Sequence, residues 1–190
     1  MSSKIIAPFI ASNLALDFIN TQFGVGEARQ ECLHDDSGVV AWLQQAGVLK
    51  EACEPPPAGI AQLARKLRDN MRDLLVSAQL EQAADSAVVN HVLEWGYPIE
   101  KIEWQPSEAV FQKKTYKRNM DSESLLHPVA ASLVQLLTEE NLQLVKQCEA
   151  SDCVLLFHDQ TKSHRRRWCS MAACGNRMKA AAHRARKKTG

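Results

Sequence analysis

Four cysteines near the C-terminus constrain the fold of this chain more than any other feature. They form two pairs with the spacing C-x4-C-x15-C-x4-C, made by Cys148, Cys153, Cys169 and Cys174. A structural Zn2+ ion prefers four tetrahedral ligands, and two cysteine pairs on separate short turns supply four thiolates without a large hydrophobic core. In a reducing compartment, paired cysteines are better explained as metal ligands than as disulfides. The spacing therefore predicts a structural site for one Zn2+ ion per chain.

The segment around and after the second cysteine pair is strongly basic. Residues 161–190 contain ten Lys or Arg residues and no Asp or Glu, whereas residues 1–160 contain the other 13 basic residues and all 22 acidic ones. The net charge is therefore +10 in the tail and 13 − 22 = −9 in the rest of the chain. When Lys or Arg neutralises a phosphate of a nucleic acid, counterions are released and binding is favoured. A predicted zinc site within a segment of this charge therefore indicates a nucleic-acid partner. The alternative is a solvated charged helix, although such helices usually mix both signs.

Length and composition are those of an ordinary globular protein, with 190 residues, of which 45% are apolar and 24% are charged. No stretch approaches the roughly 20 apolar residues of a membrane span, and the N-terminus lacks the pattern of a secretory leader. We therefore expect a cytoplasmic protein with no membrane partner. The G-x-S-x-G, P-loop, G-x-G-x-x-G and H-E-x-x-H motifs do not occur, so no enzymatic activity and no catalytic residue are predicted.

Hydrophobic periodicity predicts a mainly helical body over residues 1–140. Apolar residues recur every three or four positions from Ile60 to Leu75, and shorter periodic segments begin near residues 13, 37 and 88. Alternation over residues 99–116 predicts a β-hairpin, and Pro128 is expected to begin a further helix that ends near Glu139. The predicted fold class is α+β, with a mainly helical N-terminal domain that carries a β-hairpin.

Residues 141–190 are predicted to form a second, small unit. Residues 142–145 lead into Cys148 and residues 154–157 leave Cys153, which indicates two short strands of a hairpin. Ser170 can cap a helix whose first turn carries Cys174, and Gly175 beside it indicates a close backbone approach. A hairpin and a helix that each supply two thiolates make a treble-clef-like zinc finger.

Cationic side chains in the loop before Cys169 and on the C-terminal helix are the candidates for nucleic-acid contact. They are Arg165, Arg166, Arg167, Arg177, Lys179, Arg184, Arg186, Lys187 and Lys188. Arginine can hold a phosphate or contact guanine, and the sequence does not separate these two roles. Trp168 is expected to pack against the knuckle; the alternative, base stacking, would favour an RNA partner.

Three polar residues, Asp17, Asn20 and Thr21, follow an apolar helix start and are candidates for a ligand site in the larger domain. Asn and Thr at a helix end more often act as caps or turn residues, and this role is the stronger expectation. The neighbouring acids Asp35 and Asp36 are expected to serve a helix N-terminus rather than catalysis.

Two segments of the sequence resemble motifs of a known family. The segment R-R-W-C-S-M at residues 166–171, followed by C-G-N-R at residues 174–177 and a basic tail, closely resembles the bacterial CGNR zinc-finger family. Residues 14–21, L-A-L-D-F-I-N-T, are similar to the L-D-x-x-N-T signature that opens the ABATE domain of that family. The family is described as stress-induced transcription regulators. The resemblance implies that the four cysteines hold zinc, that the finger binds DNA and that the larger domain senses a ligand.

The leading hypothesis is a non-enzymatic, zinc-dependent DNA-binding transcription regulator with a small-molecule effector. The alternative is an RNA-binding or protein-docking zinc-finger protein whose large domain binds a small molecule. A homodimer is expected because one small finger offers few contacts, and bacterial regulators commonly bind paired half-sites. No segment of the sequence marks the dimer interface.

Overall fold

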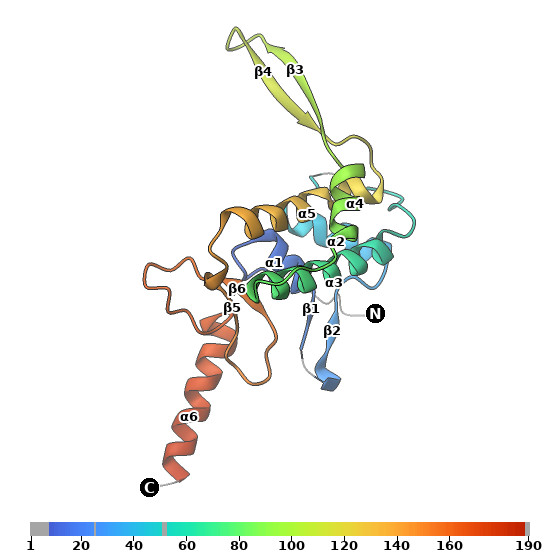
Figure 1. Cartoon of the computed structure of the whole chain (residues 1–190). Helices are drawn as coiled ribbons and strands as arrows, with labels where there is room; N and C mark the ends of the chain where they lie inside the picture. Colours follow the sequence, from blue (N-terminus) through green and yellow to red (C-terminus); the bar gives the residue numbers. More distant parts are fainter. Residues whose placement is uncertain (1–7, 25, 51–52, 189–190) are drawn as a thin grey trace.

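The computed structural model describes residues 8–24, 26–50 and 53–188 and shows an α+β protein (Figure 1). A helical body carries a long β-hairpin, and a small cysteine-rich unit ends in a helix that extends away from the body. The helices are α1 (Leu14–Ile19), α2 (Asp36–Gln45), α3 (Ile60–Gln79), α4 (Ala87–Trp95), α5 (Ser122–Glu139) and α6 (Asn176–Lys188). The strands are β1 (Gln22–Phe23), β2 (Gln30–Glu31), β3 (Ile99–Gln105), β4 (Val110–Tyr116), β5 (Val145–Gln147) and β6 (Leu156–His158). They pair in sequence as three separate antiparallel hairpins.

Helix α3 is the centre of the body and packs against α1, α2, α4 and α5. Its buried stripe includes Leu67, Met71 and Leu75, which recur every four residues and so lie on one face. Helix α1 is short, and every residue from Ala15 to Ile19 is buried. A six-residue helix of this kind is stabilised mainly by the packing of its neighbours rather than by its own propensity.

Acidic side chains hold the N-termini of several helices in the body. Asp35 caps α2 by accepting a hydrogen bond from the Gly38 N–H. The Asp36 carboxylate accepts from the Gly59 and Ala61 N–H groups at 3.0 and 2.9 Å, and thus joins α2 to the first turn of α3. The expectation that this acidic pair serves helix ends is confirmed.

The expectation for Pro128 was wrong, because this residue lies inside α5 rather than at its start. Asp121 caps the helix about two turns earlier, where its side chain accepts a hydrogen bond from the Ser124 N–H. Proline at position 128 removes one backbone hydrogen bond, to the carbonyl four residues before it. Leu125 and Leu126 in that turn are fully buried, and their packing outweighs the lost hydrogen bond.

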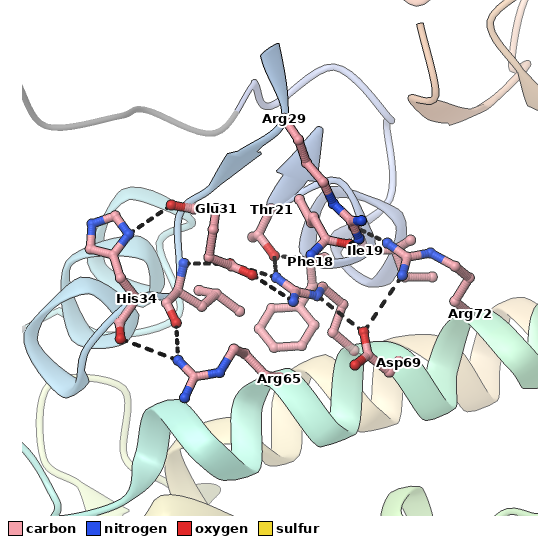
Figure 2. Close-up of polar contacts among 12 residues, drawn as sticks. Phe18, Ile19, Thr21, Arg29, Glu31, His34, Arg65, Asp69 and Arg72 are labelled. Carbon is pink, nitrogen blue, oxygen red and sulfur yellow. Dashed lines mark hydrogen bonds and ion pairs between the residues drawn. The ribbon is translucent and has the colours of Figure 1, made fainter. Parts of the chain in front are cut away.

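A buried arginine, Arg68, joins α3 to Glu31 in the segment between α1 and α2; Glu31 and Thr21 of this segment are labelled in Figure 2. Arg68 is 1% exposed, and its guanidinium donates two hydrogen bonds of 2.7 Å to the Glu31 carboxylate. Burial acts to raise the pKa of Glu31, but the hydrogen bonds from Arg68 and the Leu33 N–H outweigh it and hold the pKa below its ordinary value. The fork-like pairing compensates a charge that would otherwise be costly to bury.

Within the described part of the chain, no helix combines the length and the apolar character that crossing a bilayer requires.

Candidate metal centre and basic surface

The four predicted cysteines come together from three local structures. Cys148 follows β5, and Cys153 lies in the turn that leads towards β6. Cys169 follows an irregular loop, and Cys174 lies in a single π-helical turn, Met171–Gly175, directly before α6. The Ser170 side chain accepts a hydrogen bond from the Ala173 N–H and caps this turn, as the sequence predicted. The hairpin thus supplies two sulfur atoms, and the loop and the turn that lead into α6 supply one each.

The four sulfur atoms fit one zinc ion. All lie within 4.8 Å of one another. The distance from Cys153 Sγ to Cys169 Sγ is 3.9 Å, and from Cys169 Sγ to Cys174 Sγ it is 3.4 Å. Tetrahedral zinc with Zn–S bonds of about 2.3 Å places its sulfur ligands about 3.8 Å apart. Cys148, Cys153, Cys169 and Cys174 are therefore the residues that would hold Zn2+.

The electrostatics of the cluster disfavour free thiolates at two of the four cysteines. Burial, and after it the charge of nearby Cys148, raises the pKa of Cys153 to about 11. Burial and the neighbouring thiols likewise raise the pKa of Cys169. Burial also acts to raise the pKa of Cys148, but hydrogen bonds from the Ala150 and Cys169 N–H groups outweigh it and lower the pKa. Four thiolates this close repel one another, and a divalent ion removes that cost.

The buried carboxylate of Asp159 orders the loop between the two cysteine pairs. This role was not predicted from the sequence. Asp159 is fully buried and accepts hydrogen bonds from Lys146 Nζ at 2.7 Å and from the Arg166 N–H at 2.9 Å. It also accepts from the Thr161 hydroxyl. Burial opposes its ionisation, but these hydrogen bonds outweigh the effect and hold the pKa of Asp159 far below its usual range. The only sequence signal was an acidic residue in the turn after the hairpin.

The three candidate ligand residues of the body make hydrogen bonds that hold the finger and the core together. Asp17 Oδ1 accepts hydrogen bonds of 2.9 Å from the N–H groups of Ile10 and Ala11. Burial raises the pKa of Asp17, although these two N–H groups oppose the rise. Thr21 donates to the Phe18 carbonyl and accepts a hydrogen bond from the buried Arg68. Both side chains are thus engaged inside the protein.

Asn20 fastens the finger directly to the body. Its amide donates to the Leu156 carbonyl at 2.8 Å and accepts from the Leu156 N–H at 2.9 Å. The side chain thereby pairs with β6 as a neighbouring strand would. The His158 N–H donates to the Ala11 carbonyl at 2.8 Å, and Ala11 is itself held by Asp17. One short helix therefore fixes the position of the hairpin that carries the first cysteine pair.

The predicted nucleic-acid residues fall into two groups, and the first is engaged within the protein. The guanidinium of Arg166 donates to the carbonyls of Ile10, Trp168 and Cys169 and lies 4.1 Å above the Phe157 ring. Arg177 pairs with Asp152 and donates to the Cys174 sulfur at 3.4 Å. Arg166 thus orders the loop, and Arg177, although exposed, neighbours a metal ligand.

The second group is exposed. Arg165 lies in the loop, and Lys179, Arg184 and Lys187 lie on α6, which extends away from the body (Figure 1). Arg167 is also exposed, although it pairs with Glu149 at 2.7 Å and stacks over Trp168. The side chains of Arg186 and Lys188 lie outside the described part of the structure.

Trp168 and Gly175 pack at the metal centre. Trp168 is half-buried among the residues of the cysteine cluster, as expected for a side chain that packs against the knuckle. A Cβ atom on Gly175 would lie 3.1 Å from a Trp168 ring carbon and closer still to the Met171 side chain, so the predicted close approach is confirmed. Beside them, Phe9 and the loop arginines line an open cavity of about 860 Å³.

A second cavity, of about 450 Å³, lies between the body and the finger. From the body it is lined by Asn20, Gln22, Arg29 and Arg72, and from the finger by Gln147 and Leu156. The volume is in the range of small-molecule sites, which often lie between domains.

Comparison with known families agrees with this geometry. The model of the ABATE family, described as "Putative stress-induced transcription regulator", matches residues 12–140. The model of the CGNR zinc finger matches residues 145–187. Neither description is that of an enzyme. None of the curated proteins matches the chain.

The attachment through Asn20 can be tested by Asn20→Ala in the zinc-loaded protein. The substitution leaves the N–H and carbonyl of Leu156 without their partner, and each buried unpaired group costs about 1 to 3 kcal/mol. We expect the free energy of unfolding to fall by about 3 kcal/mol and hydrogen exchange to rise across residues 145–158. The matched control is Asn70→Ala, because Asn70 makes two similar bonds within the body, to the Asp85 carbonyl and the Val89 N–H. Equal exchange of the finger in both variants would contradict the assignment.

Proposed function

The chain belongs to the ABATE family and carries a CGNR zinc finger, and from this premise we propose that it is a zinc-dependent transcription regulator that binds DNA. The proposed role of zinc is structural: when bound, it neutralises the four thiolates and fixes the hairpin to the start of α6. The residues of the chain itself make every proposed contact with DNA.

The observation that carries the proposal is a cationic helix that stands clear of the body next to the metal centre. Lys179, Arg184 and Lys187 are exposed on α6, and no acidic residue occurs after residue 160 to offset them. An α-helix with its side chains is about 10 to 12 Å wide, which matches the width of the major groove of B-DNA. The helix end nearest the metal is the one held in place by the finger, so contacts there would be the best ordered.

The exposed residues are assigned different roles from the engaged ones. Arg165 and the exposed cations of α6 are proposed to contact phosphates, whereas Arg166 and Arg177 position the loop and the metal centre. Arg167 is intermediate, because its exposed ion pair with Glu149 is weak in water and can be exchanged for a phosphate. This division revises the sequence-based set, in which all nine cations were treated alike.

DNA binding is tested with the zinc-loaded full chain and the double variant Arg165→Gln/Lys179→Gln. Each lost phosphate contact should lower the slope of log affinity against log salt by about one, so we expect weaker binding and a slope smaller by about two. Lys66→Gln/Arg118→Gln removes the same charge from the body and should leave both quantities unchanged. Unaltered affinity and slope in the first variant would rule out this contact surface. Tighter binding of structured RNA than of duplex DNA in competition would favour the RNA alternative.

We also propose that the body senses a small anion in the cavity between the body and the finger, which Asn20 helps to line, rather than through Asp17 or Thr21. Figure 2 shows the guanidinium groups of Arg29 and Arg72 lying towards one another at the end of α1. Burial lowers the pKa of Arg72, and the charges of Arg68 and Arg29 add to the decrease, while Asp69 opposes it. The carboxylate nearest to Arg72, that of Asp69, is 3.5 Å away and also faces Arg68.

These features favour a small molecule with a carboxylate or phosphate group. Planar guanidinium groups recognise either anion through paired hydrogen bonds. Val76 on the body side and Val154 and Leu156 on the finger side would cover an apolar part of such a molecule. Because Leu156 is the residue held by Asn20, an occupant would touch the junction that sets the position of the finger.

The anion site is tested with glutarate and inorganic phosphate as probes, each compared with sodium chloride at equal ionic strength. We expect at least one probe to raise the melting temperature saturably, because a ligand that binds only the folded state stabilises it by mass action. Arg72→Gln should abolish this rise, and Lys66→Gln, on the same helix outside the cavity, should retain it. A rise that is lost in Arg165→Gln but kept in Arg72→Gln would place the anion on the finger and overturn the site, as would no saturable rise at all.

A further inference from the structure

The β3–β4 hairpin extends away from the helical body (Figure 1). It exposes apolar side chains on its surface. Its two seven-residue strands are paired throughout, with Trp104 opposite Phe111 and Ile102 opposite Lys113. Ile102 is 72% exposed and Phe111 is 66% exposed, and Trp104 is also more than half exposed. These three side chains lie on the same face of the hairpin, because cross-strand partners and alternate residues of a strand share a face.

In a single copy of the chain, this hairpin lacks a third strand or a packed face to stabilise it. An isolated two-stranded hairpin is marginally stable in water, and a third strand or a packed face is needed for independent stability. The Trp104–Phe111 ring contact and the Lys113–Glu100 ion pair join the two strands to each other. Each strand of a two-stranded sheet also has one edge whose N–H and carbonyl groups face outward and can pair with another strand.

The sequence of β3, I-E-K-I-E-W-Q, complements itself when two copies run antiparallel. If the two strands are centred on Ile102, Lys101 of each copy lies opposite Glu103 of the other. Shifting the centre to Lys101 or Glu103 places two like charges opposite one another, and like charges in directly opposed positions are unfavourable. Only one oxygen of the Glu103 carboxylate is used within the hairpin, to accept from the Tyr116 hydroxyl.

The outer edge of β4 is less suited than that of β3 to pairing with a second copy of itself. Its sequence, V-F-Q-K-K-T-Y, places Lys113 opposite itself when two copies are centred in the same way. Lysine on an edge strand is a common means of preventing unwanted pairing. From these charges and the unpartnered edge we infer that two copies of this chain dimerise by antiparallel pairing of β3 with β3. The two hairpins then form one four-stranded sheet with strand order β4, β3, β3, β4.

The consequence for DNA binding rests on the proposed function, whereas the dimer itself does not. A two-fold axis through Ile102 relates the two zinc fingers, so a dimer presents two equal basic helices. Such an arrangement fits an operator made of two inverted half-sites. The dimer is measured without DNA, so a dimer that does not bind DNA and a monomer that does are separate results.

The pairing is tested by charge reversal in the zinc-loaded full chain, with the dimer dissociation constant measured by sedimentation equilibrium. Glu103→Lys and Lys101→Glu each replace two attractive cross-strand pairs by two repulsive ones, and we expect each to weaken the dimer about tenfold or more. Glu108→Lys, in the turn that joins the strands, makes the same charge change away from the edge and should leave the constant unchanged.

Two combinations distinguish the pairing from a simple loss of folding. The double variant Lys101→Glu/Glu103→Lys restores opposite charges and should regain the dimer. An equimolar mixture of the two single variants should form heterodimers, because each then meets its complement. A monomeric wild-type chain, single variants that dimerise as well as the wild type, or failure of both combinations to restore dimers would each overturn the inference.

Discussion

The arrangement of the molecule depends on polar residues within and directly after one short buried helix, α1. Three residues within five positions connect it to three different parts of the chain. Asp17 holds the backbone of residues 10 and 11, Asn20 pairs with β6, and Thr21 accepts from Arg68 on α3. Each partner is a buried or half-buried polar group that would be costly to leave unpaired. The helix is thus a joint between the body and the finger, which explains why its polar residues look like a ligand site in the sequence.

The metal centre places a second constraint on the same junction. The hairpin that carries Cys148 and Cys153 is the one held by Asn20, and the loop that leads to Cys169 is ordered by Asp159 and Arg166. Arg166 also donates to the Ile10 carbonyl, next to the backbone that Asp17 holds. Zinc and the body therefore act on one connected set of contacts. A change at the cavity between the body and the finger would reach the base of α6 through a few hydrogen bonds.

Sequence reasoning succeeded where the signal was local. The apolar stripe of α3, the alternation of β3 and β4, the four cysteines and the cap at Ser170 all depend on residues close together in the chain. It failed for Pro128, because the burial of Leu125 and Leu126 in the core outweighs the local preference of proline for a helix start. It could not assign Asn20 or Arg166, because their partners at Leu156 and Ile10 lie 136 and 156 positions away. The self-complementary charges of β3 were visible in the sequence, but only the exposed edge gives them a meaning.

The most direct measurement is zinc content combined with hydrogen exchange of the full chain before and after removal of the metal by a chelator. We expect one zinc per chain. Without zinc, we expect the amides of residues 145–188 to exchange freely while those of α3 and α5 remain protected, since metal binding supplies much of the folding free energy of such small units. A chain that binds no zinc, or a finger that keeps its protection after the metal is removed, would show that the finger does not depend on zinc for its fold.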